Sequence, residues 1–440
     1  KESECDFIFT TIQTITRTEH LNQFKPDHFD YIIIDETHRA GAESYKKVMN
    51  YFNPKFMLGM TATPERTDGF DVFSLFNHNI AYEIRLNKAL KENMLTDFHY
   101  YGVQDISIDG KVISDKSDFR YLHAKERVNH IISTIKKYGT DNGEVNGLVF
   151  CSRQKECEEL SRAFNMWGFK TIALTGESSE KQRKKSIELL ESSGEESLDY
   201  IFTVDIFNEG IDIPKVNQVI MLRPTSSAII FVQQLGRGLR KAKNKEYVTV
   251  IDFIGNYENN YLIPIALFGD TSYNKDTIRK LISNGSRLIP GASTINFDRI
   301  TKEKIYASID NAKLTYKRDL DRDYDLLKHR LGHQPLMMDF LRTGLRDPFQ
   351  YIEYSNESFY SFASKKEEKL KGLINGKSFL ILKYLSKEIN NAVRVEESLI
   401  LHHLISNGHS SLSELNQDLR KRYNYEVDLS TFNSVLNNLN

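Results

Sequence analysis

The sequence predicts parallel α/β layers over roughly its first 260 residues, followed by a mainly helical region. Short apolar runs rich in β-branched and aromatic residues recur there, and helical patterns separate several of them. We expect strands at residues 7–11, 31–34, 56–60, 148–151, 171–174, 200–204, 216–222 and 247–253. After about Asn260 the strand signal fades and helical periodicity dominates.

The length of the chain indicates several domains. A chain of 440 residues and 51.0 kDa exceeds what one hydrophobic core usually fills, and about three units are expected. We place a first lobe at residues 1–90, a connection at 91–118, a second lobe at 119–260 and a mainly helical domain at 261–440. The connection is assigned because the apolar pattern becomes irregular around Asp109-Gly110-Lys111.

Composition excludes several classes of protein. The 59 Lys and Arg residues nearly balance 60 Asp and Glu residues, which excludes a uniformly basic nucleic-acid coat protein but allows a local basic groove. Three cysteines exclude a disulfide framework and a four-cysteine zinc site, and they fit a reducing cytoplasm, the expected location. No apolar run approaches the ~18 residues of a membrane span, so no membrane partner is expected.

Two adjacent carboxylates follow the predicted strand at residues 31–34. Asp35 and Glu36 would lie at the carboxyl end of a buried parallel strand, where α/β sheets bind ligands. One carboxylate can hold Mg²⁺, and the other can orient and deprotonate a water for attack on a phosphate. The alternative is a solvated turn, which an Asp-Glu pair alone would favour.

A second polar segment reads Gln-Gln-Leu-Gly-Arg-Gly-Leu-Arg over residues 233–240. On a helix, Gln233, Arg237 and Arg240 fall at i, i+4 and i+7 and hence on one face. A guanidinium suits a transferring phosphoryl group because it is always charged and donates in a fork. The alternative for two such arginines is a surface ion pair.

Together these segments resemble the motifs of superfamily 2 helicases. Asp-Glu-Thr-His at 35–38, Thr-Ala-Thr at 61–63, VDIFNEGIDIP at 204–214 and QQLGRGLR at 233–240 are similar to motifs II, III, V and VI. Residues 150–153 look like motif IV, and residues 10–14 look like the nucleic-acid-contacting motif upstream of motif II. The correct order makes the resemblance specific. The sequences TATPERTDG and FNEGIDIP are more similar to those of the restriction-enzyme and excision-repair branch than to those of DEAD-box RNA helicases.

The resemblance implies two RecA-like lobes, use of ATP with Mg²⁺, and binding of nucleic acid, most often duplex or partly single-stranded DNA. It implies that Asp35 coordinates Mg²⁺ and that Glu36, also a candidate metal ligand, is the general base. The other residues it assigns to the nucleotide are His38, Gly210, Asp212, Gln233 and the arginine fingers Arg237 and Arg240. Thr61 and Thr63 would couple hydrolysis to nucleic-acid binding.

The resemblance also assigns contacts with the nucleic-acid backbone. These are Thr10, Thr11, Gln13, Ser152, Arg153, Thr175, Gly176 and Thr203. Many members carry a threonine six residues before the motif V glycine; here that position is Val204, and Thr203 is its neighbour. Basic residues cluster at 181–185 and 237–245, and those that flank Thr175 and Arg153 are the best candidates for phosphate contacts.

One motif of the family is missing. A phosphate-binding loop, Gly-x-x-x-x-Gly-Lys-Ser/Thr, is expected before Asp35, yet residues 1–34 contain no glycine. Gly376-Lys377-Ser378 does not supply it, because the first glycine would fall at Lys371, and we expect a helix start there. We therefore expect a truncated first lobe that binds ATP poorly alone. A partner that supplies the loop and an inactive lobe are the alternatives.

The C-terminal region carries no catalytic prediction. Residues 286–309 and 331–340 resemble an uncharacterised module that follows the core in some bacterial superfamily 2 helicases. Residues 411–439 have a helix–turn–helix rhythm, which could contact DNA or a protein, although the same rhythm is common in plain helical packing.

The expected function of the intact protein is that of an ATP-dependent DNA helicase or translocase. The alternatives are an inactive nucleic-acid clamp or scaffold with a helicase fold, an RNA-directed enzyme of the same fold, and the motor of a bacterial restriction or defence nuclease. The last would have a nuclease domain or subunit as its partner.

Overall fold

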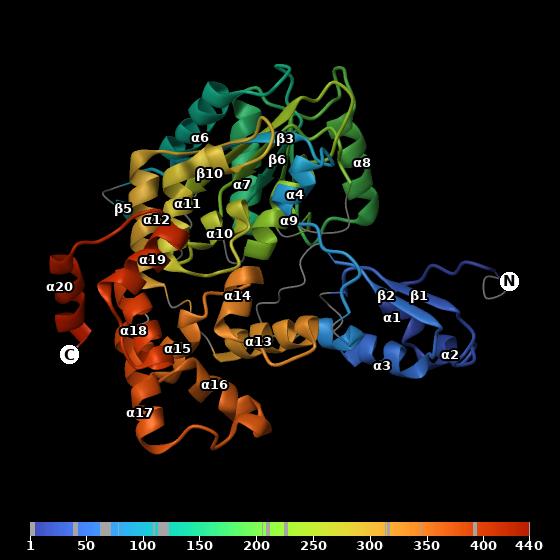
Figure 1. Cartoon of the computed structure of the whole chain (residues 1–440). Coiled ribbons are helices and arrows are strands. Elements are labelled where there is room, and N and C mark those ends of the chain that lie inside the picture. The colour runs from blue at the N-terminus through green and yellow to red at the C-terminus, as the bar shows by residue number, and fades with distance from the viewer. Residues whose placement is uncertain are drawn as a thin grey trace. The chain divides into compact units, whose positions relative to one another are not determined.

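The computed structural model describes residues 5–37, 43–61, 72–77, 79–108, 111–112, 123–204, 206–207, 212–223, 228–312, 314, 317–343, 345–389 and 394–439. The chain divides into two compact units, Lys1–Leu314 and Thr315–Asn440, each of which is described by itself. The first unit contains two parallel sheets, and the second is helical in its described residues (Figure 1). The predicted α/β class with a mainly helical C-terminal region is therefore confirmed.

A small βαβ arrangement forms the first part of the first unit. Strand β1 (Tyr31–Ile34) pairs in parallel with β2 (Phe56–Gly59), and α3 (Glu43–Tyr51) lies between them in the chain. The short helices here are α1 (Ile12–Ile15), α2 (Thr18–Leu21) and the 3₁₀ helix η3 (Val72–Phe76). Their core consists of Ile15, Leu21, Phe24, Val48 and Phe52.

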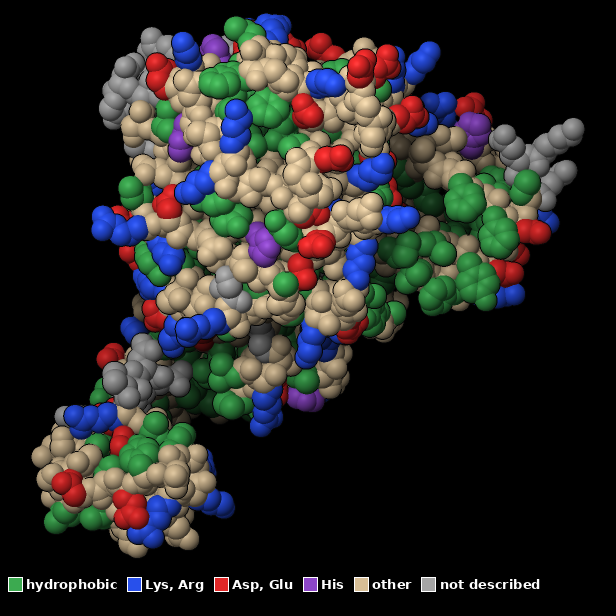
Figure 2. Space-filling view, turned by 90° about the horizontal axis from the view of Figure 1, so that it is seen from above, with side chains coloured by type: hydrophobic (Ala, Val, Ile, Leu, Met, Phe, Trp, Pro, Cys, Tyr) green, Lys and Arg blue, Asp and Glu red, His purple; other side chains and the backbone are tan. Residues whose placement is uncertain are grey.

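Apolar side chains of this small sheet also reach the surface. Tyr31, Ile33 and Phe56 are more than half exposed, and hydrophobic side chains gather on the surface of this part of the chain (Figure 2). A parallel sheet is normally covered on both faces, so this part of the fold leaves an apolar face open in the described structure.

The strand predicted at residues 7–11 is wrong. This segment has no regular structure, and Phe9 is 95% exposed. Thr11 instead caps α1, because its side chain accepts a hydrogen bond from the backbone N–H of Thr14. The cap turns the chain into a helix at the position where the apolar pattern suggested an extended run.

A sheet of seven parallel strands forms the main body of the first unit. The strand order is β11-β3-β10-β9-β6-β8-β7. The strands are β3 (Asp97–Gln104), β6 (Gly147–Phe150), β7 (Thr171–Leu174), β8 (Tyr200–Thr203), β9 (Gln218–Met221), β10 (Tyr247–Ile254) and β11 (Thr294–Phe297). A short antiparallel pair, β4 (Ser107–Ile108) and β5 (Lys111–Val112), follows β3.

Helices cover both faces of this sheet (Figure 1). One face packs against α6 (Lys125–Tyr138) and α7 (Gln154–Met166). The other packs against α4 (Leu86–Lys91), α8 (Glu180–Glu191), α9 (Ala228–Gly238), α10 (Leu262–Phe268), α11 (Lys275–Asn284) and α12 (Arg299–Asn311), with the 3₁₀ helix η4 (Gly285–Leu288) after α11. Alternate residues of a strand enter opposite cores, as Leu148 and Val149 of β6 do.

Two strands of the main sheet lie where none was predicted. β3 falls in the segment expected to be a connection, and β11 falls after Asn260, in the region expected to be helical. β3 pairs with β10 on one side and with β11 on the other, so both strands belong to the main sheet. The main sheet and its helices accordingly extend to Leu314 rather than ending near residue 260.

The described residues of the second unit form helices only. They are α13 (Lys317–Leu331), α14 (Met337–Thr343), α15 (Phe349–Ser355), α16 (Phe359–Lys366), η5 (Glu368–Leu370), α17 (Gly376–Tyr384), η6 (Leu385–Ile389), α18 (Val395–Asn407), α19 (Leu412–Tyr423) and α20 (Leu429–Leu439). Helices α13–α16 share one core, and α18–α20 share another. Helix α17 begins at Gly376, which confirms that Gly376-Lys377-Ser378 is a helix start.

Candidate nucleotide and nucleic-acid sites

The Asp-Glu pair lies in a turn directly after β1. The backbone N–H of Glu36 donates to Oδ1 of Asp35 over 2.9 Å, and Glu36 has a φ of 50°. A non-glycine residue in this left-handed region is uncommon, and such strained positions concentrate at functional sites. Asp35 is exposed and Glu36 is half-buried, so the carboxylate of Asp35 is open to a ligand from solvent.

Thr37 anchors this turn to the neighbouring strand. Its side chain is buried, and its hydroxyl lies 2.7 Å from the carbonyl oxygen of Met60 and 3.0 Å from that of Ile34. The backbone N–H of Thr37 also donates to Met60 O over 2.9 Å. Because Thr61 follows Met60, the Asp-Glu turn is joined to the start of the Thr-Ala-Thr segment. His38 and Thr63 lie outside the described residues.

The second group of nucleotide candidates lies around α9. Gln233 and Arg237 lie one turn apart on this helix, and Arg240 forms an ion pair with Asp212, with 2.9 Å between Nη1 and Oδ2. Asp212 and Arg240 are 55% and 50% exposed at their side chains, so a ligand has access to both. The structure thus brings together residues of the motifs that resemble V and VI. Gly210 lies outside the described residues.

The prediction of a single helical face is wrong for Arg240. Helix α9 ends at Gly238. The backbone N–H of Leu239 donates to the carbonyl of Gly236, three residues earlier, and this 3₁₀-type bond ends the helix. Arg240 therefore follows the helix end, and its ion pair with Asp212 sets its position.

One member of the basic cluster at 237–245 serves a different purpose. The ammonium of Lys245 donates to the carbonyls of Pro214, Val216 and Gly238, the last two over 3.0 Å. Burial lowers the pKa of Lys245 to about 8, although Asp141 and Glu191 act in the opposite direction. Its donors are thus directed at the backbone, so Lys245 fastens the end of α9 to the segment before β9.

Three strands present the nucleic-acid candidates of the main sheet at one edge. β6, β8 and β7 are neighbours, and Thr203 is in register with Phe150 on one side and Leu174 on the other. The residues that follow these strands therefore lie along the same edge. They include Ser152, Arg153, Thr175 and Gly176, and an ideal Cβ on Gly176 would lie 3.9 Å from Nε2 of Gln154.

Exposure distinguishes the side chains at this edge. Arg153 is exposed at the N-cap of α7, whereas Thr175 is buried and Thr203 is fully buried. The side chain of Thr203 therefore does not reach the surface on which a nucleic-acid backbone would lie. Arg183 of α8 donates to the carbonyls of Thr175 and Gly176 over 3.4 and 3.2 Å, so this basic residue shapes the turn.

The candidates near the N-terminus lie on and before α1. Thr10, Thr11 and Gln13 are all exposed. The hydroxyl groups of Thr11 and Thr14 lie 2.9 Å apart, within the first turn of the helix. These side chains are open to solvent, as a contact with a phosphate backbone requires.

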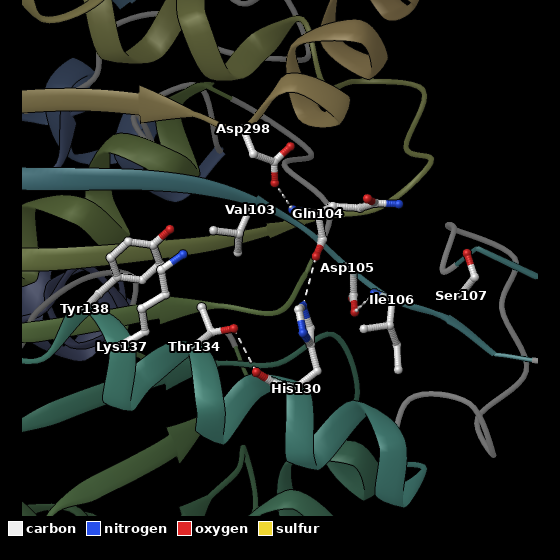
Figure 3. A pocket seen from close by; sticks show the side chains of 10 residues that line it. All are labelled: Val103, Gln104, Asp105, Ile106, Ser107, His130, Thr134, Lys137, Tyr138 and Asp298. Atoms are coloured by element: carbon white, nitrogen blue, oxygen red, sulfur yellow. Dashed lines mark hydrogen bonds between the residues drawn. The ribbon is translucent and has the colours of Figure 1, made fainter.

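A cavity of about 440 Å³ lies at the end of β3, away from these candidates in the sequence. The residues that line it come from β3, the turn after it, β4, α6 and the N-cap of α12 (Figure 3). His130 Nε2 lies 3.0 Å from the carbonyl of Gln104, whose backbone N–H donates to Asp298 Oδ2 over 2.7 Å. These polar groups are satisfied by one another.

The donor chemistry at the Asp-Glu turn fits a magnesium ion. Among the residues that the structure describes, no group of three or more His, Cys, Asp and Glu side chains forms a metal cage. Mg²⁺ does not need one, because it usually binds one or two carboxylates together with water and substrate phosphates. Asp35, exposed at a strand end, offers such a carboxylate.

No helix in the described part of the chain is both long and apolar enough to cross a membrane.

Sequence reasoning missed the residues that hold these segments in place. The sequence places Lys245 only in a basic cluster, and it gives Glu156, which bonds to Ser152, no role. No local pattern marks either one, because the groups that each contacts are defined only once the strands have paired.

Comparison with known families matches three segments of the chain. Residues 1–66 match the family described as type III restriction enzyme, res subunit, and residues 126–242 match the helicase conserved C-terminal domain. Residues 320–440 match a domain of unknown function. The first two matches cover the segments that carry the motifs read from the sequence.

Individual relatives agree with these matches. IRC3 of Saccharomyces cerevisiae is 26% identical over 57% of this chain and 37% of its own length. A type I restriction enzyme EcoAI endonuclease subunit of Escherichia coli is 26% identical over 55% of this chain and 34% of its own length. The chain thus spans just over a third of these curated relatives. The solved structure of the type ISP restriction-modification enzyme LlaBIII bound to DNA is 17% identical over 98% of this chain and 34% of its own, with a TM-score of 0.49.

Proposed function

We propose that this protein is an ATP-dependent DNA helicase or translocase. The proposal starts from the membership of this chain in the restriction-enzyme and repair branch of superfamily 2 helicases. The observation that carries the proposal is the strained Asp35-Glu36 turn at the carboxyl end of β1, fastened by Thr37 to the segment that begins at Thr61. Such a turn places two carboxylates beside a segment that can respond to their ligand.

The residues divide the chemistry between them. Mg²⁺ bound with ATP would neutralise charge on the phosphates, and Asp35 is the residue that would hold it. Glu36 orients and deprotonates the attacking water. Arg237 and Arg240 direct positive charge at the transferring phosphoryl group, with Asp212 holding Arg240 in place and Gln233 contacting the nucleotide.

Nucleic acid is the second substrate. The exposed Arg153, at the edge formed by β6, β8 and β7, and the exposed Thr10, Thr11 and Gln13 are the described candidates for its backbone. DNA rather than RNA is proposed because the chain matches the res subunit family of type III restriction enzymes and resembles a type I restriction endonuclease subunit. The relation to an endonuclease subunit favours a motor that works with a nuclease domain or subunit as a second candidate.

Hydrolysis of ATP tests the proposal directly. It is measured on the full gene product, including any sequence encoded before residue 1, with duplex DNA, single-stranded DNA, RNA and no nucleic acid. We expect stimulation by DNA that Glu36→Gln abolishes and that Glu43→Gln, an exposed acid on α3, leaves intact. Hydrolysis that is unchanged by Glu36→Gln would contradict the assignment. No hydrolysis under any condition would favour the clamp or scaffold, and stimulation by RNA alone would favour an RNA-directed enzyme.

A further inference from the structure

Three charged side chains form a fully buried cluster beside the sheet edge. Arg127 of α6 donates to Asp105, with 2.8 Å between Nη2 and Oδ2, and to Glu156, with 2.8 Å between Nη1 and Oε1. The Nε atom of Arg127 lies 3.0 Å from the same oxygen of Asp105. All three side chains have no exposed surface, and they come from the end of β3, from α6 and from α7.

The second carboxylate oxygen of Glu156 binds the turn after β6. It accepts hydrogen bonds from the backbone N–H of Ser152 over 2.9 Å and from the hydroxyl of Ser152 over 2.6 Å. Glu156 therefore bridges the guanidinium of Arg127 and the turn that carries Arg153. Since Arg153 is the N-cap of α7, its backbone is held on one side by the helix and on the other by this bridge.

The energetics of this cluster indicate a role beyond stability. Burial of each charge costs several kcal/mol, and apolar side chains of similar volume often stabilise a core as well or better. Burial opposes the charge on Arg127, but Asp105 and Glu156 outweigh it and raise the pKa of the guanidinium, so Arg127 is charged. The cluster fixes the orientation of both carboxylates, because Arg127 makes a bidentate contact with Asp105 and a single contact with Glu156.

We infer that Arg127 and Glu156 are positioning residues that present Arg153 to a phosphate of the nucleic-acid backbone. The inference rests on the proposed function. Within the proposed nucleic-acid site, it assigns the charged contact with a phosphate to Arg153. The hydroxyl of Ser152 has one proton, which it donates to Glu156, and its N–H has the same acceptor. Ser152 therefore shapes the turn, and Arg153 supplies the charge.

The affinity of the chain for labelled duplex DNA, measured by fluorescence anisotropy over a range of salt, tests this role. Arg153→Ala is expected to weaken binding about tenfold and to lower the slope of log K against log salt by about one. Glu156→Gln should weaken binding comparably without touching DNA. The double variant should bind no more weakly than Arg153→Ala, because a positioning residue has no effect once the residue that it positions is gone.

Glu158→Gln is the matched control, because it removes one carboxylate charge from an exposed position on the same helix. Binding by Glu156→Gln that equals the binding of this control, or losses that add in the double variant, would overturn the inference. If Glu156→Gln does not fold, as judged by its melting curve, Ser152→Ala keeps all three charges in place. Because it removes the hydroxyl bond to Glu156, it should weaken binding less than Arg153→Ala does and should add no further loss in an Arg153→Ala background, whereas losses that add in that double variant would overturn the inference.

A readout without nucleic acid separates this inference from the proposed function. The backbone N–H of Ser152 should be protected from hydrogen exchange in the wild type and in Glu158→Gln, and should exchange faster in Glu156→Gln. Equal exchange in all three would overturn the positioning role. Failure of the wild type to bind DNA or RNA while exchange differs would instead overturn the proposed function, and with it the phosphate contact.

Discussion

The hydroxyl of Thr37 lies 2.7 Å from the carbonyl oxygen of Met60, to which it donates a hydrogen bond. A side chain of the Asp-Glu turn is thereby bonded to the last residue before Thr61, in addition to the backbone N–H of Thr37, which donates to the same carbonyl. A carbonyl with two donors from one residue is held in direction as well as in distance. A shift of the Asp35-Glu36 turn therefore moves the start of the Thr-Ala-Thr segment.

Thr37→Val should loosen this link without changing the shape of the side chain. The variant loses the hydroxyl bonds to Met60 and Ile34 and keeps the backbone bond, so a loss of about 1–2 kcal/mol in local stability is expected. Hydrogen exchange of the amides of β1 and β2 measures it. Thr18→Val, at an exposed position of α2, should leave these amides unchanged. If the amides of β1 and β2 were equally protected from exchange in Thr37→Val and Thr18→Val, the hydroxyl of Thr37 would not stabilise these strands.

Two glycines of one helix should respond oppositely to alanine. A Cβ on Gly238 would lie 2.8 Å from a methyl carbon of Val248 and 3.0 Å from one of Val219, whereas a Cβ on Gly236 would meet nothing within 4 Å. We expect Gly238→Ala to destabilise the main sheet by about 1–3 kcal/mol. Gly236→Ala should be neutral or stabilise it by up to ~1 kcal/mol.

Denaturant unfolding measures both glycine variants. The fluorescence of Trp167 is a local probe, because this residue is the single tryptophan of the chain and is the C-cap of α7. A Gly238→Ala variant as stable as the wild type would show that Val219 and Val248 move apart at little cost. The close packing of the end of α9 against β9 and β10 would then not explain the glycine.

Lys245→Met should destabilise the end of α9. The ammonium is the donor to the carbonyls of Pro214, Val216 and Gly238, so its removal takes three hydrogen bonds from them, and we expect a loss of about 1–3 kcal/mol in unfolding free energy. Lys243→Met removes the same charge from an exposed position two residues away and should leave stability within about 0.5 kcal/mol of the wild type. Trp167 fluorescence again reports unfolding. Equal stability of the two variants would mean that Lys245 is an ordinary surface charge that does not stabilise the end of α9.

Most of the main sheet could be predicted from the sequence, because its central strands are uninterrupted apolar runs. β6 and β8 are buried at every position and leave no competing pattern. β3 escaped prediction because it contains Asp97, His99 and Gly102, and its place in the sheet depends on pairing with β10, about 150 residues later in the chain. Such a partner is a tertiary fact that local periodicity does not contain.

The candidate sites divide in the same way. The positions of Asp35 and Glu36 after a strand could be predicted, because a motif with fixed spacing lies next to an apolar run. The ion pair between Asp212 and Arg240 could not, since the end of α9 at Gly238 depends on packing against β9 and β10. A charged residue such as Glu156 reads as part of a solvated helix face until the fold places Arg127 beside it.

Asp252 should make the stability of the main sheet depend on pH. Burial raises the pKa of its carboxyl to about 7 from an ordinary value of 3.8, while the 2.6 Å hydrogen bond from the hydroxyl of Tyr100 acts in the opposite direction. Because the folded pKa is the higher one, the contribution of this group to stability is fully present below pH ~4. It is lost as the pH rises from ~4 to ~7, and by at most about 4 kcal/mol.

The difference between the wild type and Asp252→Asn isolates this group, because all other titrating residues are shared. Unfolding free energies from Trp167 fluorescence between about pH 5 and 8 should show the wild type losing stability relative to the variant as the pH rises. Tyr100→Phe should shift that loss to higher pH, since it removes the hydrogen bond that favours the ionised carboxylate. Asp298→Asn is the control: its carboxylate accepts backbone hydrogen bonds from Gln104 and Thr301, so it tests whether the loss of any hydrogen-bonded Asp has the same effect. Curves for the wild type and Asp252→Asn that run parallel over this range would mean that Asp252 is ionised in the folded protein and that the buried pair with Tyr100 costs far less than its burial implies.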